Sequence, residues 1–332
     1  MLKLLQSYKK IIIILSFPYL YLLFLLVAPT SLAVTAPGGL TPVDHAIVID
    51  SVEFVDNFNT VYVYSFHPIT PFQSFVLASD ATMNVKPMTV RETDTSWRDD
   101  FRAGQISKIV SLRTSLIKAY ELAALEDSSI VIDYEYRGLF IYYRPSRLSE
   151  LEIGDIIVEI NGNSYEDYTH QEFRQLAYLP EIRYKVMRLV NDVETFFYFE
   201  YTKPEEDQYM IFYPNYEIVS ASPSFDFPGE NSIVGGPSGG MIQTLSIYAS
   251  LLKLNFDDLK IAGTGTIEID GTIGRIGGIT QKMYTGIYNK IDVFFIPQSH
   301  FSEIPNLDYP YEIIVVNTIE EAVEALHELI NE

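Results

Sequence analysis

The protein has 332 residues, of which 48% are hydrophobic, and a formal net charge of -21. This length and composition suit two or three domains with substantial cores and exclude a disordered or low-complexity protein. The acidic excess and the lack of a segment rich in lysine and arginine argue against nucleic acid as a partner. Because the chain contains no cysteine, disulfides, thiol catalysis and cysteine-ligated metals are excluded.

The N-terminal segment predicts contact with the cell membrane through residues 11–34. Residues 11–27 carry no charge, and with the milder stretch to Val34 the segment is long enough to cross a bilayer. Lysines lie only before it, so we expect a single-pass protein with a cytoplasmic N-terminus and the bulk of the chain extracytoplasmic. A cleaved signal peptide is the alternative, with a loose cleavage site at residues 31–33. The apolar run is long for such a peptide, which favours an uncleaved signal anchor.

The next segment predicts mainly β structure. Residues 35–42 are rich in turn formers and predict a linker after the membrane segment. Residues 46–55 and 60–66 are β-branched and aromatic with stretches of alternation, and they predict strands. Residues 105–125 place apolar side chains at helical spacing and predict a helix.

Residues 129–203 predict a separate unit of strands around one short helix. Within it, LEIGDIIVEING at residues 151–162 resembles the hallmark of PDZ domains, with a tight turn at Asn161-Gly162. In that family a peptide adds as a strand beside a loop that holds its end, so the resemblance implies peptide pairing along residues 139–143. The alternative is a module that only packs against its neighbours. The resemblance assigns the loop to Tyr136, Arg137, Gly138 and Leu139.

A lone serine, Ser238, lies among glycines in GGPSGG. A serine hydroxyl is a poor nucleophile until a base takes its proton, and the sequence offers two kinds of base. The first is a histidine, since residues 236–240 fit the G-x-S-x-G elbow of α/β-hydrolases and His300 and His327 lie downstream. Too few residues follow for a doubly wound sheet, which disfavours this interpretation.

The second candidate base is Lys282. A helix beginning near Ile279 places Ile279, Met283 and Ile287 on one apolar face, and Lys282 lies on that face. Desolvation lowers the pKa of a lysine amine, and a neutral amine can deprotonate a serine. The alternative is a lysine whose stem covers the edge of the core while its amine stays in water.

The order of motifs from GGPSGG through AGTGTI and GGITQK to the strand ending at Pro297 resembles the proteolytic domain of Lon-type serine proteases. The resemblance implies that Ser238 is the nucleophile, Lys282 the general base, and Thr264 a neighbour of the lysine amine. Residues 241–252 predict a buried helix whose N-terminal N–H groups would face the site and hold an oxyanion. Gly239 stands where that family usually has alanine, which adds backbone freedom. The nucleophile turn and oxyanion region are assigned to Gly236, Pro237 and Gly239.

Taken whole, the chain is similar to the membrane-anchored PDZ–Lon serine proteases of Gram-positive bacteria (the YlbL type). The expected fold class is therefore α+β. The expected segments are a cytoplasmic tip and signal anchor, a β-rich segment with a helix, a PDZ-like domain and a Lon-type protease domain, at residues 1–34, 35–128, 129–203 and 204–332.

This resemblance implies an ATP-independent serine endopeptidase that cleaves exported or membrane-associated proteins or peptides at the outer face of the cell membrane. No cofactor, ATP or metal is expected, because the chain has no G-x-x-x-x-G-K-[ST] loop and its five histidines are scattered. Lon domains often form rings, so the resemblance is compatible with a homo-oligomer. The alternative function is a non-catalytic membrane-anchored PDZ adaptor with a Lon fold as scaffold.

Overall fold

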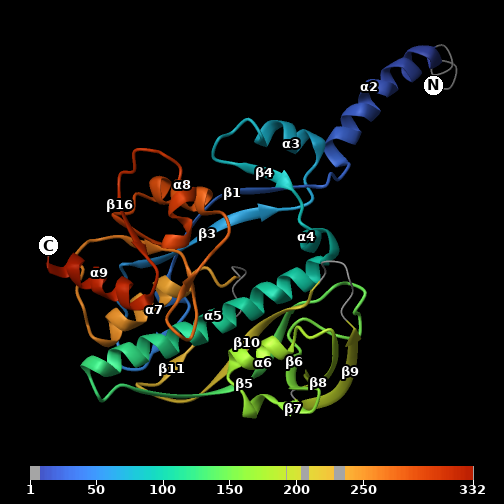
Figure 1. The fold of residues 1–332 in the computed structure, drawn as a ribbon. Helices are drawn as coiled ribbons and strands as arrows, with labels where there is room; N and C mark the ends of the chain where they lie inside the picture. The colour runs from blue at the N-terminus through green and yellow to red at the C-terminus, as the bar shows by residue number, and fades with distance from the viewer. Residues whose placement is uncertain (1–7, 192, 203–208, 228–235, 332) are drawn as a thin grey trace.

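The computed structural model describes residues 8–191, 193–202, 209–227 and 236–331, which form a mixed α+β structure. An apolar helix, α2 (Lys9–Val27), projects from the body, and the long helix α5 (Trp97–Glu126) runs between two packed units (Figure 1). Among the described residues, α2 is the one helix long and apolar enough to cross a membrane. None of its residues is buried, although a signal sequence near an N-terminus has the same properties.

The first unit is built on a six-stranded sheet in the order β16-β15-β12-β3-β1-β4. Strands β16, β15, β12 and β3 are parallel, while β1 runs antiparallel to both β3 and β4. Segments far apart in the chain therefore share one sheet. Its strands are β1 (Leu32–Pro42), β3 (Phe58–Phe66), β4 (Asn84–Pro87), β12 (Ile261–Gly263), β15 (Val293–Pro297) and β16 (Glu312–Val316).

Helices cover the two faces of this sheet. On one face α7 (Gly240–Leu251), apolar on nearly every side and wholly buried, packs between α5 and α9 (Ile319–Asn331) and against Phe58 of β3. On the other face α8 (Ile279–Asn289) packs against β1 and β3. The helix α9 begins after Thr318, whose hydroxyl oxygen accepts the backbone N–H of Glu321, as expected for an N-cap.

The second unit has its own sheet, in the order β10-β5-β6-β8-β9 with β7 beside β6, and its own core around Phe173 and Tyr184. The predicted turn at Asn161 and Gly162 is present, with φ of 51° and 85°. The elements are β5 (Val131–Tyr143), β6 (Ile156–Ile160), β7 (Asn163–Ser164), α6 (His170–Leu176), β8 (Glu181–Val190), β9 (Val193–Thr202) and β10 (Ile211–Ser222).

Short elements complete the described chain. Two small sheets pair β2 with β11 and β13 with β14, and two short helices, α3 and α4, precede α5. Their bounds, with those of the 3-10 helices, are β2 (Val48–Ile49), β11 (Phe225–Asp226), β13 (Thr266–Ile267), β14 (Ile273–Gly274), α3 (Pro71–Leu77), α4 (Val90–Asp94), η1 (Val43–His45), η2 (Tyr165–Asp167) and η4 (Gln298–Glu303).

Two expectations for the N-terminal part are wrong. The membrane segment was expected to reach Val34, but α2 ends at Val27, and Ala33 and Val34 are buried in β1. The linker expected at residues 35–42 is the rest of β1, because β3 pairs with it along that stretch and satisfies its backbone groups. The glycines that indicated a linker allow a bulge: a Cβ on Gly38 would lie 2.2 Å from the carbonyl oxygen of Tyr62.

The β-rich segment also differs in detail from expectation. Of the strand expected at residues 46–55, only Val48–Ile49 pairs, while the helix expected at 105–125 extends over the whole of α5. The boundary expected between residues 203 and 204 lies outside the described residues. The strand that follows it, β10, belongs to the sheet of the second unit, so the four-segment division stays a prediction and both units draw on neighbouring segments.

Candidate active site

Ser238 lies in the turn that leads into α7. The turn is possible because Gly236 adopts φ of 106°, a region that favours glycine. The carbonyl oxygen of Ser238 accepts the backbone N–H of Gly265 at 2.8 Å and the hydroxyl of Thr264 at 3.1 Å. The loop after β12 therefore holds the serine turn in place by two hydrogen bonds.

Lys282 extends from α8 and is buried, with a relative exposure of 2%. Its Nζ donates to Thr264 Oγ1 at 2.7 Å. Burial, which disfavours the charged form, lowers the pKa of Lys282 to about 7. A substantial fraction of this lysine is therefore a neutral amine near neutral pH.

Thr264 connects the two candidate residues and fixes the roles of their atoms. Its single hydroxyl proton is given to the carbonyl oxygen of Ser238, so its oxygen accepts from Lys282. When neutral, the lysine amine donates one N–H to Thr264 and keeps its lone pair for another partner. Thr264 thus orients the amine without consuming the lone pair that would take a proton.

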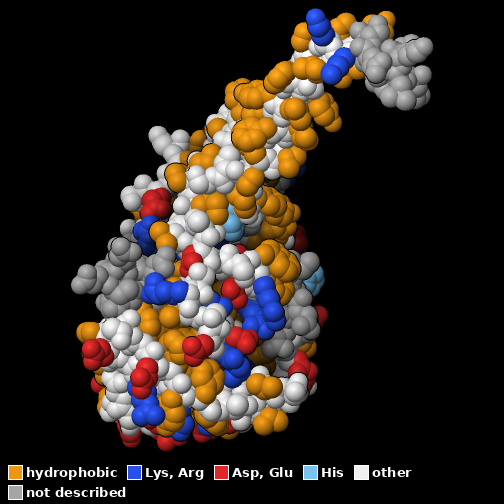
Figure 2. All heavy atoms as spheres, turned by 90° about the vertical axis from the view of Figure 1, so that its right-hand side faces the viewer, with side chains coloured by type: hydrophobic (Ala, Val, Ile, Leu, Met, Phe, Trp, Pro, Cys, Tyr) orange, Lys and Arg blue, Asp and Glu red, His pale blue; other side chains and the backbone are white. Residues whose placement is uncertain are grey.

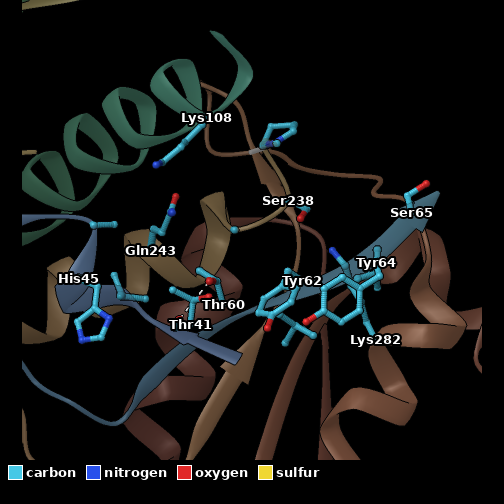
Figure 3. A pocket seen from close by; sticks show the side chains of 18 of the residues that line it. Thr41, His45, Thr60, Tyr62, Tyr64, Ser65, Lys108, Ser238, Gln243 and Lys282 are labelled. Atoms are coloured by element: carbon cyan, nitrogen blue, oxygen red, sulfur yellow. Dashed lines mark hydrogen bonds between the residues drawn. The ribbon is translucent and has the colours of Figure 1, made fainter. Parts of the chain in front are cut away.

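Ser238 and Lys282 line the same cavity, which has a volume of 680 Å³. Figure 3 shows the serine hydroxyl and the lysine amine directed toward the same space. No hydrogen bond joins these two groups among the contacts of the described residues. The arrangement matches an uncomplexed site in which the nucleophile and base share a cavity and tighten when substrate arrives.

A gap in the sheet allows Lys282 to reach this cavity. Val61 of β3 packs with Met283 of α8 on one face, whereas Phe58 packs with α7 on the other. The pairing of β12 with β3 stops at Thr60. The chain that forms β12 leaves the sheet at this point. Lys282, on the α8 face of the sheet, can therefore approach Ser238 at the start of α7, on the other face.

Backbone N–H groups at the serine turn are available to an oxyanion. The N–H of Gly240 donates to Pro237 and that of Met241 donates to Gly265. Among the hydrogen bonds of residues 236–331, none uses the N–H of Ser238 or Gly239. These two donors precede the N-terminus of α7, where the helix dipole favours negative charge.

Residues 223–329 match the family described as the Lon protease (S16) C-terminal proteolytic domain.

The match indicates a Lon-type proteolytic domain in this part of the chain, and members of that family are serine peptidases. Lon protease 2 of Bacillus subtilis (strain 168) is 29% identical over 101 residues, which are 30% of this chain and 18% of the relative. The chain thus spans about a fifth of that relative's length. The match to the family does not reach residues 129–203, whose PDZ-like character stays a prediction, nor the strands β1 and β3 that complete the sheet.

The structure adds two polar side chains to the Lon-type site that sequence reasoning missed. Lys108 from α5 and Gln243 from α7 are buried and line the cavity with Ser238 (Figure 3). The signal was present in the expected helix at 105–125. There Lys108 belongs to a face with the small residues Ser111 and Ser115, which lets α5 pack closely against α7.

The cavity also has an aromatic side formed by β3. Tyr62 and Tyr64 meet edge to face at a centroid distance of 5.6 Å, and Tyr64 stacks with Phe66 at 6.1 Å. Tyr64 and Phe66 remain exposed. These rings give the site a surface suited to apolar or aromatic side chains of a bound peptide.

One edge of β3 is unpaired beside the cavity. The N–H of Ile261 in β12 donates to the carbonyl of Asn57. Every second residue after Asn57 along β3 therefore directs its N–H and C=O groups toward the β12 side. Beyond Thr60 no described strand pairs with that side. Val63 and Ser65 therefore present N–H and C=O groups to the cavity, as an exposed strand edge does.

The expected peptide site of the second unit is not a free loop, because all four of its residues lie inside β5. Leu139 pairs with Pro214 of β10 on one side and with Ile157 of β6 on the other, so no edge is left for a peptide. The positions assigned to peptide binding are therefore structural, and that assignment is wrong for Tyr136, Arg137, Gly138 and Leu139.

The side chains at these positions explain their structural role. Arg137 makes ion pairs with Glu135 and Glu217. Gly138 has φ of 95°, and a Cβ there would lie 2.3 Å from the carbonyl oxygen of Ile157. The Tyr136 ring packs against the side of Phe173 at a centroid distance of 6.4 Å.

The strand β10 fills the space between β5 and α6. Phe212 is buried against the rings of Tyr178 and Tyr184, at centroid distances of 5.7 and 6.2 Å. The hydroxyl of Tyr216 makes a 2.8 Å hydrogen bond with Nδ1 of His170, the first residue of α6. The chain itself thus occupies the position that an added peptide strand would take.

The histidines of the hydrolase alternative have other partners. His300 Nε2 accepts the backbone N–H of Ile276, and its Nδ1 faces Glu303 at 3.0 Å. His327 Nε2 hydrogen-bonds the hydroxyl of Tyr248. Neither histidine lines the cavity that contains Ser238.

Proposed function

We propose that the protein is a serine endopeptidase in which Ser238 is the nucleophile and Lys282 the general base. The observation that carries the proposal is the buried amine of Lys282, which has a pKa of about 7, donates to Thr264 and shares a cavity with Ser238. A base with a pKa near the working pH is the most effective kind.

The chemistry follows from these atoms. Ser238 Oγ forms a bond to the peptide carbonyl carbon while its proton passes to Lys282 Nζ. The carbonyl oxygen becomes an oxyanion held by the N–H groups of Ser238 and Gly239. As the C–N bond breaks, Lys282 returns the proton to the leaving amine. Water then attacks the acyl-enzyme, with Lys282 accepting and returning a proton in the same way.

The substrate is proposed to lie as an extended strand along the open edge of β3. Pairing with Val63 and Ser65 would continue the sheet where β12 leaves it. Alternate side chains of the peptide would then contact Tyr64 and Phe66, which remain exposed at the cavity. This placement favours flexible segments over folded ones, because only an extended chain can pair with an edge.

The protease is proposed to act without ATP at the outer face of the cell membrane, anchored by α2. The apolar composition of α2 and its lack of burial support the anchor, and the lysines before it support the orientation. Orientation can be tested directly because the chain has no cysteine. A single Tyr288→Cys substitution should label with a membrane-impermeant maleimide in intact cells, and protection until lysis would reverse the orientation.

The dyad is tested with Ser238→Ala and Lys282→Met. Each should lower kcat/KM on a susceptible peptide by at least about 10³-fold, since the nucleophile and base act as a unit. Lys290→Ala, at an exposed lysine just after α8, is the matched control and should cleave normally. Full activity of Lys282→Met would contradict the proposed base. Full activity of Ser238→Ala would contradict the proposed nucleophile. A wild-type protein that cleaves no peptide would leave the adaptor as the better function, although the filled groove beside β5 disfavours it.

A further inference from the structure

The short helix α3 exposes a large apolar surface and buries no residue. Phe75 has a relative exposure of 81%, Val76 of 47% and Phe72 of 45%. The helix PFQSFVL carries no charged side chain. A helix of a globular domain normally buries its apolar side against the core, whereas these three side chains remain uncovered in the described chain.

The position of α3 indicates what covers it. It packs against α2, and the backbone N–H of Thr30, just after α2, donates to the carbonyl of Ile69 at 2.9 Å. The N–H of Ile69 in turn donates to Leu32 at 3.0 Å. Figure 1 shows α3 beside the base of α2, and Figure 2 shows apolar side chains along α2 down to the body. The exposed rings therefore lie where the membrane-crossing helix would leave the bilayer.

We propose that α3 lies in the outer bilayer interface, with Phe72, Phe75 and Val76 inserted among the lipid headgroups and upper acyl chains. This inference rests on the proposed membrane anchor. The capping box between Thr70 and Gln73 completes the N-terminus of α3, so this very short helix keeps its form while its apolar side chains face outward. Uncharged amphipathic contact of this kind depends on buried apolar area.

This placement brings the catalytic cavity close to the membrane. Strand β3, whose Tyr64 and Phe66 line the cavity, leads within five residues from its end to α3. A second attachment beside α2 holds the open edge of β3 at a defined height above the lipid. The substrate class it selects is extended segments that emerge from the outer bilayer surface, such as the flanks of membrane-spanning proteins.

The test places a fluorescent reporter on α3 in the full chain. In a Trp97→Phe background, Phe75→Trp is compared with Tyr288→Trp, another exposed aromatic site, on α8. Both variants are measured with vesicles of phosphatidylcholine and phosphatidylglycerol. With brominated acyl chains, the α3 reporter should be quenched at least twofold more and emit at shorter wavelength. Equal quenching and equal emission at both sites would overturn the proposal.

Cleavage gives an independent test. Changing Phe72, Phe75 and Val76 together to serine should lower cleavage of a vesicle-tethered reporter about fivefold and leave cleavage of a free peptide unchanged. An equal loss on both substrates would overturn the role of α3 in substrate selection. Loss of tethered cleavage without lipid quenching would assign the face to a protein partner and overturn the bilayer proposal. If the wild type cleaves nothing, the proposed function fails, while the fluorescence still decides the docking of α3.

Discussion

Two strands of this molecule, β5 and β3, differ in whether both of their edges are paired. In the second unit β5 is paired on both sides, with β10 on one and β6 on the other. In the Lon-type site β3 is paired on one side only beyond Thr60, and that open edge faces the cavity that Ser238 and Lys282 line. An extended peptide can add only where backbone groups are unpaired. Peptide recognition is therefore expected at the candidate active site and not in the unit that resembles a peptide-binding domain.

The side chains follow the same contrast. Beside β5 the rings of Phe212 and Tyr184 pack together and are buried. Beside β3 the rings of Tyr64 and Phe66 stack but remain open to solvent. Similar aromatic residues thus stabilise one region and offer a binding surface in the other.

The largest expected effect on stability comes from removing the Phe212 ring, which β10 packs beside β5. Phe212→Ala should lower the free energy of unfolding by about 3–4 kcal/mol, because it removes a buried ring at the centre of the second unit. Thermal unfolding measures this, with the half-exposed Phe196→Ala as control, expected within about 0.5 kcal/mol. Peptide cleavage below the transition should persist. Equal destabilisation by both variants would show that β10 does not anchor the unit.

At the candidate site beside the open edge of β3, peptide cleavage should depend on pH through Lys282. The amine acts as a base only when neutral, and its pKa is about 7. Well below that value kcat/KM should fall about tenfold per pH unit, giving about 50-fold between pH 7 and pH 5, and above it the rate should level off. Peptide cleavage across pH 5–9 measures the profile. A midpoint near 10, the usual lysine value, would mean that the amine is solvated and the proposed base is wrong.

Gly239, which follows Ser238, should resist replacement by alanine in this chain. A Cβ on Gly239 would lie 2.9 Å from Cγ2 of Thr60, the residue at which the open edge begins. Thr60 is held by a hydrogen bond from its hydroxyl to Thr41. Gly239→Ala should therefore cost about 1–2 kcal/mol of stability. Adding Thr60→Ser, which removes the methyl but keeps the hydroxyl, should recover most of it. Additive losses in the double variant would rule out this steric explanation.

The smallest expected effect is on the edge itself. Ser65→Pro removes one N–H from the side of β3 that faces the cavity. It should raise KM about fivefold, which corresponds to the loss of about one hydrogen bond, with little change in kcat. Ser65→Ala keeps the N–H and is the matched control. Steady-state kinetics on a short peptide distinguishes them. If Ser65→Ala raises KM as much as Ser65→Pro does, the side chain matters and the proposed strand pairing does not.

Much of the candidate site could be predicted from the sequence, because short local patterns of residues determine the serine turn and the face of the lysine helix. The glycines around Ser238 predicted a turn before a helix, and the structure has it. The spacing around Lys282 placed this lysine on an apolar face but left open whether its amine is buried or in water. The resemblance to Lon-type proteases favoured the buried amine, and the structure buries it. Whether these residues catalyse stays a proposal. The open edge of β3 was not predictable, because it depends on where β12 stops pairing about 200 residues later in the chain.

Errors arose where distant pairing overrides local pattern. Glycine and proline at residues 35–42 indicated a linker, yet pairing with β3 makes this segment a strand with a bulge. The loop assigned to Tyr136–Leu139 matched a peptide-binding pattern, yet β10 occupies its edge. Neither partner strand can be identified from the residues of the segment itself.

The sheet that places β3 beside β12 joins residues such as Phe58 and Ile261. During synthesis, a chain that has grown just past β3 still lacks both Ser238 and Lys282. Strands β15 and β16 are added only near the end of the chain. The sheet beside the candidate active site would therefore be complete only when almost the whole polypeptide is present. The proposed peptidase activity would then be absent from unfinished chains, because the strands that complete the sheet are made last.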